Sequence, residues 1–171
     1  MNGQGEAVLF QYRDAVYEDF PLIASFPLNE DEAYYMFPSG SYPLDVEQLR
    51  LKAEERKSLT VVTDAGEVVG YGNLYDVNPG EDCWIGNVIL RPSSRGTGAA
   101  SYLIQTLINR AAEEHRVKTV RLVCHNTNTR ALIFYSNLGF KPYDVRLPEG
   151  AAARKIVGIR MSIPVEGQVT L

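Results

Sequence analysis

The sequence predicts an α+β fold in which helices flank a mixed, mostly antiparallel central sheet of about six or seven strands. Residues 58–91 alternate β-branched runs with glycine-containing turns, a pattern typical of an antiparallel meander. Residues 94–115 carry the clearest helical periodicity in the chain. Because an apolar run lies on each side of that helix, we expect a strand, a helix and a second strand parallel to the first.

The N-terminal third is predicted to hold one strand and three helical segments. The strand covers residues 7–12, and a helix follows over residues 14–26. The apolar face of that helix would consist of Val16, Phe20, Ile23 and Ala24. A short acidic helix and an aromatic loop interrupted by prolines occupy residues 28–45. Asp45 then precedes a polar helical segment, residues 46–57, as an N-cap would.

The rest of the chain is predicted to complete the sheet. The meander strands are residues 58–64, 67–77 and 82–91, joined by the turns DAGE and NPGE. The helix at 94–115 has an apolar face of Ala100, Leu103, Ile104, Leu107, Ile108 and Ala111. The elements that follow are a strand at 118–126, a helix at 128–138, and closing strands at 140–145 and 153–163.

Composition and charge narrow the class of protein. With 171 residues, 45% hydrophobic and 22% charged, the chain fits a single domain, residues 1–171, with its own core. A net charge of −4 argues against a nucleic-acid-binding surface, and no apolar run reaches the roughly 18 residues that span a bilayer. Cys83 and Cys124 lie in apolar runs without a CxxC motif, so we expect buried thiols in a reducing compartment. We therefore expect a cytoplasmic protein with no metal, membrane or nucleic-acid partner.

The stretch RPSSRGTGAASYLI, residues 91–104, connects a predicted strand to the long helix. The first turn of a helix leaves about four N–H groups without intrahelical partners, and the aligned peptide dipoles add partial positive charge there. Gly96 and Gly98 let the backbone approach an anion closely, and Arg95 offers a charged donor. On their own, these residues fit a phosphate site and an ordinary glycine-containing turn equally well.

A dinucleotide-binding loop is the competing interpretation of the same glycines. Gly96 and Gly98 follow a strand and open a helix, but Ser101 stands where the third glycine is required. No acidic residue ends the next strand, where a ribose would need one, and too few residues remain for a doubly wound domain. The sequence therefore disfavours a dinucleotide site.

A second group of candidate residues lies in residues 126–140. Asn128 and Tyr135 are seven residues apart, which places them on nearly the same helix face, about 10 Å apart along the axis. Both side chains can therefore face one cleft. Structural roles explain them as well, because Asn128 is a favourable N-cap, Tyr135 can pack with its hydroxyl at the surface, and Gly139 ends the helix.

Together the two segments resemble the GNAT superfamily of N-acetyltransferases. The family's cofactor loop, Arg/Gln-x-x-Gly-x-Gly/Ala, is found at residues 95–100, after Pro92. Its second motif, Asn-x-x-Ala followed by Tyr and then Leu-Gly-Phe, is found at residues 128–140. Each motif alone is weak, but their order, with a helix and a strand between them, is specific. The resemblance covers roughly residues 59–140 and implies that the parallel strand-helix-strand unit binds acyl-CoA.

The resemblance implies acetyl-CoA as co-substrate and assigns residues to it. Backbone groups of Val88, Ile89 and Leu90 would border the pantetheine between two splayed strands, and Asn128 would hold the pantetheine arm. Tyr135 would be the catalytic acid that protonates the leaving thiolate. The pyrophosphate site would consist of Arg95, Gly96, Thr97, Gly98, Ala99, Ala100 and Ser101.

The implied reaction is direct attack of a primary amine on the thioester. An alkyl ammonium has a reference pKa of about 10.4 and must lose a proton first, so a base or a water chain leading to one is expected. Glu81, Asp82 and His125 are the candidates. His125 is more simply explained as a strand-end histidine bonded to backbone.

We expect the acceptor to bind in the segment of residues about 14–57, and acetyl-CoA in the core of residues about 82–140. The stretch NEDEAYYMFPSGSY combines carboxylates with aromatic side chains, which suits an ammonium group. Its aromatic residues are Tyr34, Tyr35, Phe37 and Tyr42. A solvated helix face with aromatic core packing is the simpler interpretation. The predicted function is acetylation of a primary amine on a small molecule or protein; the alternative is an acyl-CoA sensor without turnover, and a homodimer is compatible with both.

Overall fold

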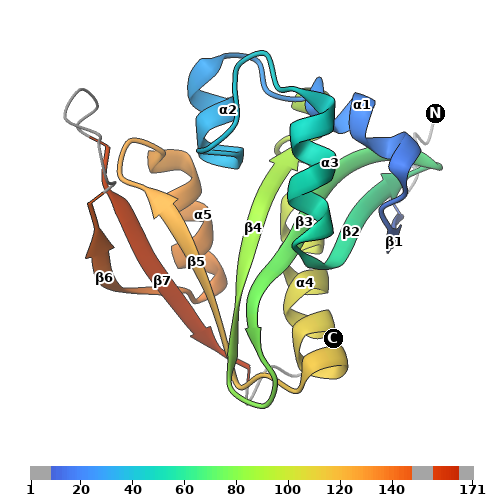
Figure 1. Ribbon diagram of the computed structural model, residues 1–171. Helices are drawn as coiled ribbons and strands as arrows, with labels where there is room; N and C mark the ends of the chain where they lie inside the picture. Colours follow the sequence, from blue (N-terminus) through green and yellow to red (C-terminus); the bar gives the residue numbers. More distant parts are fainter. Residues whose placement is uncertain (1–8, 148–155, 166–171) are drawn as a thin grey trace, which may run out of the picture.

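The computed structural model of the protein describes residues 9–147 and 156–165. Its centre is a seven-stranded sheet with the strand order β1-β2-β3-β4-β5-β7-β6 (Figure 1). The strands are β1 (Phe10–Asp14), β2 (Lys57–Asp64), β3 (Glu67–Asn78), β4 (Asp82–Leu90), β5 (Thr119–His125), β6 (Lys141–Arg146) and β7 (Gly158–Pro164). Among the strands of the described residues, only β4 and β5 pair in parallel, so the predicted mixed sheet is confirmed.

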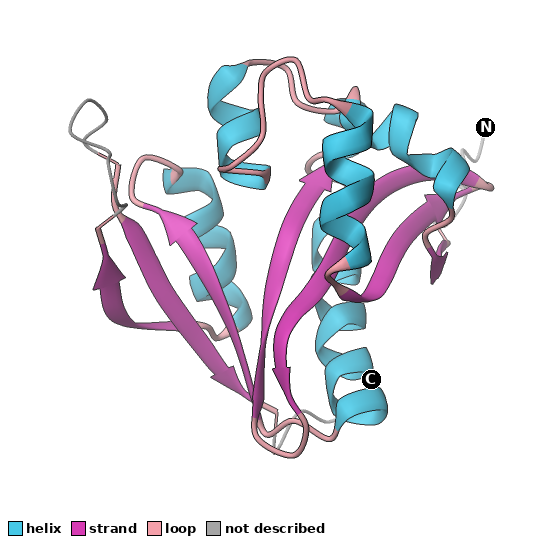
Figure 2. Ribbon diagram, viewed as in Figure 1, coloured by secondary structure: helices cyan, strands magenta, loops and turns pink. Residues whose placement is uncertain are grey.

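Helices cover both faces of this sheet (Figure 2). They are α1 (Phe20–Ala24), α2 (Glu30–Met36), α3 (Val46–Glu54), α4 (Ala99–His115) and α5 (Thr129–Leu138), with 3-10 turns η1 (Tyr17–Asp19) and η2 (Pro92–Ser94). One core lies between α1–α3 and the sheet, around Phe20 and Tyr71. A second core lies under α4, around Leu103 and Leu107, and α5 packs against it.

The N-terminal helix differs from the prediction. Residues 14–26 do not form one helix, because η1 and the five-residue α1 take its place. Asp19 explains the break, since its buried carboxylate accepts a hydrogen bond from Val16 N at 2.8 Å and binds the Arg13 guanidinium at 2.8 and 2.9 Å. The strand predicted at residues 7–12 is observed as β1, and its first two residues lie outside the described part of the chain.

The long helix starts at Ala99 rather than at residue 94, after the separate turn η2. Gly96 and Gly98 have φ angles of 76° and 95°, in the left-handed region that ends regular right-handed helix. The apolar periodicity therefore predicted the buried face of α4 but placed its first turn too early.

Two local predictions are confirmed. Asp45 caps α3, and its carboxylate accepts a hydrogen bond from Gln48 N at 2.9 Å. The DAGE turn joins β2 to β3 through Ala65 and Gly66, whose φ angles of 49° and 83° suit a two-residue hairpin.

Strands β4 and β5 diverge soon after they begin. Their parallel pairing is limited to Asp82 with Thr119, Cys83 with Val120, and Trp84 with Arg121. Beyond these residues the sheet opens into a V whose wide end lies at the C-terminal ends of both strands (Figure 1). The opening leaves backbone groups on each strand without a partner strand.

Candidate functional site

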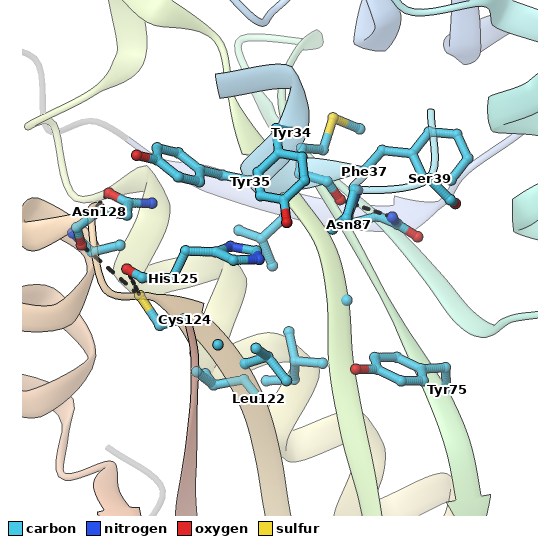
Figure 3. Close-up of a pocket in the computed structure, with 18 of the residues that line it drawn as sticks. Tyr34, Tyr35, Phe37, Ser39, Tyr75, Asn87, Leu122, Cys124, His125 and Asn128 are labelled. Atoms are coloured by element: carbon cyan, nitrogen blue, oxygen red, sulfur yellow. Dashed lines mark hydrogen bonds between the residues drawn. The ribbon is translucent and has the colours of Figure 1, made fainter. Parts of the chain in front are cut away.

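A cavity of about 940 Å³ occupies the opening between β4 and β5. Its wall takes residues from α2, β3, β4, β5, α5, β6 and β7 and from the end of α3, so both halves of the chain contribute. Figure 3 shows Tyr34, Tyr75, Leu122 and His125 around this space. Because unpaired strand edges border the opening, an extended molecule can bind there as an added strand does.

A bulge in β4 shapes one wall of the cavity and was not predicted. Asn87 has a φ of 51°, and the register with β3 shifts just after Tyr71. The Asn87 side chain is held at both ends, because Nδ2 donates to Met36 O at 2.9 Å and Oδ1 accepts from Asn73 Nδ2 at 2.9 Å. The bulge is thereby tied to α2. The available signal was an Asn inside an apolar strand, since Asn adopts positive φ more readily than most residues.

His125 ends β5 at the open side of the V and lines the cavity. Its ring centre lies 5.0 Å from that of Tyr34 and 5.6 Å from that of Tyr35, and its side chain forms no hydrogen bond with the described residues. The expected hydrogen bond from the His125 side chain to backbone is therefore not found within the described residues. Burial lowers the pKa of His125, so the imidazole is neutral near pH 7 and can accept a proton.

Asn128 and Tyr135 both line the cavity from α5. Asn128 caps this helix, and its Oδ1 accepts a hydrogen bond from Ala131 N at 3.3 Å. The Tyr135 ring contacts Phe140, and its hydroxyl forms no hydrogen bond with the described residues. Burial and, to a lesser extent, the neighbouring Cys124 raise the pKa of Tyr135, so its phenol stays protonated.

The glycine loop lies beyond β4 and outside the cavity wall. A Cβ on Gly96 would meet nothing within 4 Å, so the backbone is open there. The first helical bond after the loop runs from Tyr102 N to Gly98 O at 3.1 Å. The amides of residues 96–101 precede that bond and have no intrahelical acceptor, which is the arrangement that binds anions.

The side chain of Arg95 forms an ion pair and hydrogen bonds with other residues of the protein. Its guanidinium binds the Glu32 carboxylate at 2.6 and 3.0 Å and donates to Leu90 O at 3.3 Å. The hydrogen bond from Arg95 is also the main cause of the lowered pKa of Glu32. Arg95 thus ties the loop to α2 and, in this conformation, does not extend freely from the loop.

Glu81 and Asp82, the other candidate bases, lie at the closed end of the V. Asp82 accepts hydrogen bonds from Asn78 at 2.9 Å and Arg121 at 3.0 Å, and the Asn78 bond is the main cause of its lowered pKa. Neither acid belongs to the described wall of the cavity. Glu81 and Asp82 are therefore too far along the chain from the reactive site to be the base. They lie at the start of β4, whereas the wide end of the V lies at the end of β4.

The acidic and aromatic residues of the N-terminal segment separate in the structure. Tyr34, Tyr35 and Phe37 line the cavity, whereas none of the segment's carboxylates belongs to the described wall. Tyr42 does not line it either, and its hydroxyl donates to Leu28 O at 3.3 Å. The predicted pairing of carboxylates with aromatic faces is therefore not present in the cavity.

Basic side chains that the sequence pattern did not mark stand in the wall instead. They are Lys52, Arg56 and Arg146. The Arg56 guanidinium lies 4.0 Å from the centre of the Tyr75 ring. These residues come from distant parts of the sequence, so no local spacing connects them.

Within residues 9–147 and 156–165, no helix is long and apolar enough to cross a bilayer. The same residues contain no group of three or more His, Cys, Asp or Glu side chains that could hold a metal ion. Cys83 and Cys124 are buried and unpaired, as predicted, and burial raises the pKa of each thiol to about 12. Neither thiol is therefore activated as a nucleophile.

Solved structures with this arrangement of strands are known. Spermidine N-acetyltransferase from Vibrio cholerae, in complex with CoA and spermine, is 20% identical with a TM-score of 0.73, covering 91% of this chain and 95% of that one. The ribosomal-protein-alanine N-acetyltransferase from Escherichia coli is 17% identical with a TM-score of 0.68, covering 95% and 100%. An N-acetyltransferase from Staphylococcus aureus is 18% identical with a TM-score of 0.70, covering 92% and 99%. At these identities the likeness shows the shared fold.

A family model extends the likeness to the sequence. The model of the acetyltransferase (GNAT) family matches residues 16–140, which is well over half of the chain. No curated protein sequence matches significantly. The match includes the glycine loop and the α5 motif with Asn128 and Tyr135. The chain therefore belongs to the GNAT family of acetyltransferases.

Proposed function

We propose that the protein transfers the acetyl group of acetyl-CoA to a primary amine. The observation that carries this proposal is the V between β4 and β5, with His125 and Tyr135 in the wall of one cavity inside it. The V offers an extended cleft, a neutral base and a protonated phenol in the same space. These are the parts that acyl transfer to an amine requires.

The donor would bind through backbone more than through side chains. The pantetheine arm would lie along Val88, Ile89 and Leu90, which have no strand partner on the β5 side. The pyrophosphate would bind the amides of residues 96–101, a fit supported by the open backbone at Gly96. Asn128 would hold the arm in addition to capping α5. In this proposal Arg95 positions the loop through Glu32 and is not itself the phosphate ligand.

Three proton transfers accompany the reaction. His125 would take one proton from the acceptor ammonium, which frees the nitrogen lone pair. The nitrogen then bonds to the thioester carbonyl carbon, the carbon–sulfur bond breaks, and the sulfur takes the phenol proton of Tyr135. The nitrogen, which still carries one proton too many for an amide, gives that proton to the Tyr135 phenolate, and this restores the phenol. The lowered pKa of His125 leaves it unprotonated near pH 7, and the raised pKa of Tyr135 leaves it protonated, which are the starting states that these two roles require.

The direct test is to incubate the protein with acetyl-CoA and a panel of primary amines that includes amino acids, diamines and peptides. We expect thiol release matched mole for mole by an acetylated amine in mass spectrometry. Absence of both products across the panel would contradict the proposal.

Tyr135→Phe separates an enzyme from a sensor of the same fold. We expect kcat to fall about 100-fold with little change in the KM for acetyl-CoA, because only the proton donor is removed. Tyr12→Phe is the matched control, since Tyr12 is 49% exposed on the edge strand β1. Tight acetyl-CoA binding without turnover in the natural protein, unchanged by Tyr135→Phe, would identify a sensor instead.

A further inference from the structure

The charge of the cavity wall identifies a class of acceptor. Resting on the proposed function, we infer that the acceptor amine also carries an anionic oxygen group, a carboxylate or a phosphate, which Arg56 and Arg146 bind. The wall contains both arginines and Lys52, and no Asp or Glu belongs to its described part. The acceptor side of the cavity is therefore cationic, although the whole chain has a net charge of −4.

The Arg56 side chain packs between the Tyr75 ring and the backbone of β4. Its guanidinium stacks over the Tyr75 ring at 4.0 Å and lies directly against β4, where a Cβ on Gly86 would come within 2.7 Å of Arg56 Nη1. Nη1 is buried and has no hydrogen-bond partner among the described residues. Burial is also the main cause of the lowered pKa of Arg56, yet a guanidinium stays charged in proteins.

A buried cation is unfavourable unless an opposite charge or a hydrogen-bond acceptor, here from a ligand, compensates for its lost hydration. Guanidinium presents parallel N–H donors that match the two oxygens of a carboxylate or phosphate. An anionic oxygen in the cavity would give the Arg56 guanidinium, which lines that cavity, a counter-charge and a hydrogen-bond acceptor.

Arg146 reaches the same place from the opposite side of the V. It lies on β6 and lines the cavity. Burial raises the pKa of Tyr75, and the positive charges of Arg56, Arg146 and Arg160 each act in the opposite direction. Arg160 is neutralised by Asp144 at 3.1 Å, whereas Arg56 and Arg146 have no ion pair with the described residues. Within residues 9–147 and 156–165, two cations without an ion pair therefore act on Tyr75.

The two carboxylates that act on Arg56 do not pair with it. Glu55 binds Lys52 at 2.9 Å, and Asp76 is exposed on β3. Both act on Arg56 only over a distance, without a hydrogen bond, and neither belongs to the described wall.

The placement also orients the acceptor. Figure 3 shows Tyr75 on one side of the cavity and His125 and Asn128 on the other. An acceptor with its anion at Tyr75 can direct its amine towards His125. A polyamine in the same position would bring further ammonium groups against Arg56 and Arg146, and like charges brought together in an interface oppose binding.

Matched amines test the inference. Steady-state kcat/KM is measured for tyrosine against tyramine, for phosphoethanolamine against ethanolamine, and for spermidine. We expect the anionic member of at least one pair to exceed its partner and spermidine by 10-fold or more. The pair that shows the preference distinguishes a carboxylate from a phosphate. Equal or better activity on the member without the anion in both pairs, or on spermidine, would overturn the inference.

Variants assign the preference to Arg56. Arg56→Gln should lower kcat/KM about 10- to 100-fold for the amine that carries the anion and leave the partner without the anion within about threefold. Arg56→Lys should keep part of the preference, because it keeps the charge and loses the fork. Arg116→Gln, at the exposed end of α4, is the control and should change neither. A preference that is unchanged in folded Arg56→Gln would contradict the assignment.

A binding measurement separates failure of the inference from failure of the proposed function. If no amine is acetylated, the proposed function fails, and calorimetry with N-acetyltyrosine and N-acetyltyramine in the presence of CoA decides the charge preference alone. Binding of N-acetyltyrosine only, lost in Arg56→Gln, would support an anion site. N-acetylphosphoethanolamine and N-acetylethanolamine test a phosphate in the same way. Equal binding within both pairs, or no binding of either anionic product, would refute the anion site.

Discussion

The two ends of the proposed active site are built from different parts of the protein chain. The proposed donor end depends on backbone groups, namely the amides of residues 96–101 and the unpaired edge of β4. The acceptor end depends on side chains that come from separate elements, among them Tyr34, Arg56 and Arg146. One end is therefore encoded in a short continuous stretch, and the other is assembled only by folding.

This difference explains why the donor is easier to identify than the acceptor. A backbone site can keep its function while most of its side chains change, provided that glycines keep the loop open. A side-chain site changes its preferred ligand with one or two substitutions, because charge and hydrogen bonding decide specificity. Variants that affect one end and spare the other should make this difference measurable.

The largest effect is expected for Gly98→Glu at the donor end. The substitution puts a negative side chain beside the proposed pyrophosphate site, and repulsion of several kcal/mol should weaken acetyl-CoA binding by about 100-fold or more. Calorimetry with CoA measures this loss. Gly80→Glu is the matched control, because Gly80 also has a positive φ, of 80°, and a Cβ there would meet no atom within 4 Å, but it lies in the β3–β4 turn. Unchanged CoA affinity in Gly98→Glu would disprove the placement of the pyrophosphate.

A smaller effect is expected for His125→Gln, where the two ends meet. We expect kcat/KM to fall about 10- to 100-fold, because the proposed base is lost. In the natural protein, activity should decline at acidic pH with an apparent pKa below the ordinary imidazole value of 6.5, since burial lowers the pKa of His125. That decline should be absent in the variant. A pH profile with the same acidic limb in both proteins would exclude His125 as the base.

The same histidine predicts a dependence of stability on pH. The folded pKa of His125 is lower than the unfolded value, so the unfolded chain binds more protons below about pH 6.5. Stability should therefore fall as the pH drops through this range, and His125→Gln should reduce the fall. Urea unfolding at pH 5.5 and pH 7.5 measures the difference.

The donor end and the acceptor end also differ in how well the sequence predicts them. The sheet, the helix α4 and the loop at Gly96 and Gly98 were predictable because each leaves a local signal in periodicity or turn residues. The start of α4 was missed because periodicity does not report the φ angles of those glycines. The single helix expected at residues 14–26 does not form, because the carboxylate of Asp19 accepts hydrogen bonds from the Arg13 guanidinium and from Val16 N.

The acceptor end could not be predicted in the same way. In the sequence, Arg56 is one of several charged residues in a segment predicted to be a polar helix. Its contact with Gly86 and Tyr75 arises only in the folded protein. The carboxylates of the N-terminal segment suggested a site for a cation, but they do not face the cavity. Composition within a segment does not show the direction in which its side chains point.

Asn128 should show a moderate effect that separates its two roles. Asn128→Ala removes the cap of α5 and should lower the free energy of unfolding by about 1 kcal/mol. Asn128→Ser keeps a capping oxygen and should be nearly as stable as the natural protein. If Asn128 also holds the pantetheine arm, the serine variant should still have a severalfold higher KM for acetyl-CoA. A normal KM in Asn128→Ser would leave only the capping role.

The smallest effect is expected for the ion pair between Arg95 and Glu32, which ties the donor loop to α2. Both side chains are partly exposed, at 25% and 23%, so a double-mutant cycle with Arg95→Gln and Glu32→Gln should give a coupling of about 0.5–1 kcal/mol. The pKa of Glu32 is lowered, so this contribution is present above the ordinary carboxyl pKa and is lost as the pH falls below it. If Arg95 acts only through Glu32, the two single variants should raise the KM for acetyl-CoA equally, by about two- to threefold. A much larger rise in Arg95→Gln would instead mean that the guanidinium leaves Glu32 and binds phosphate directly.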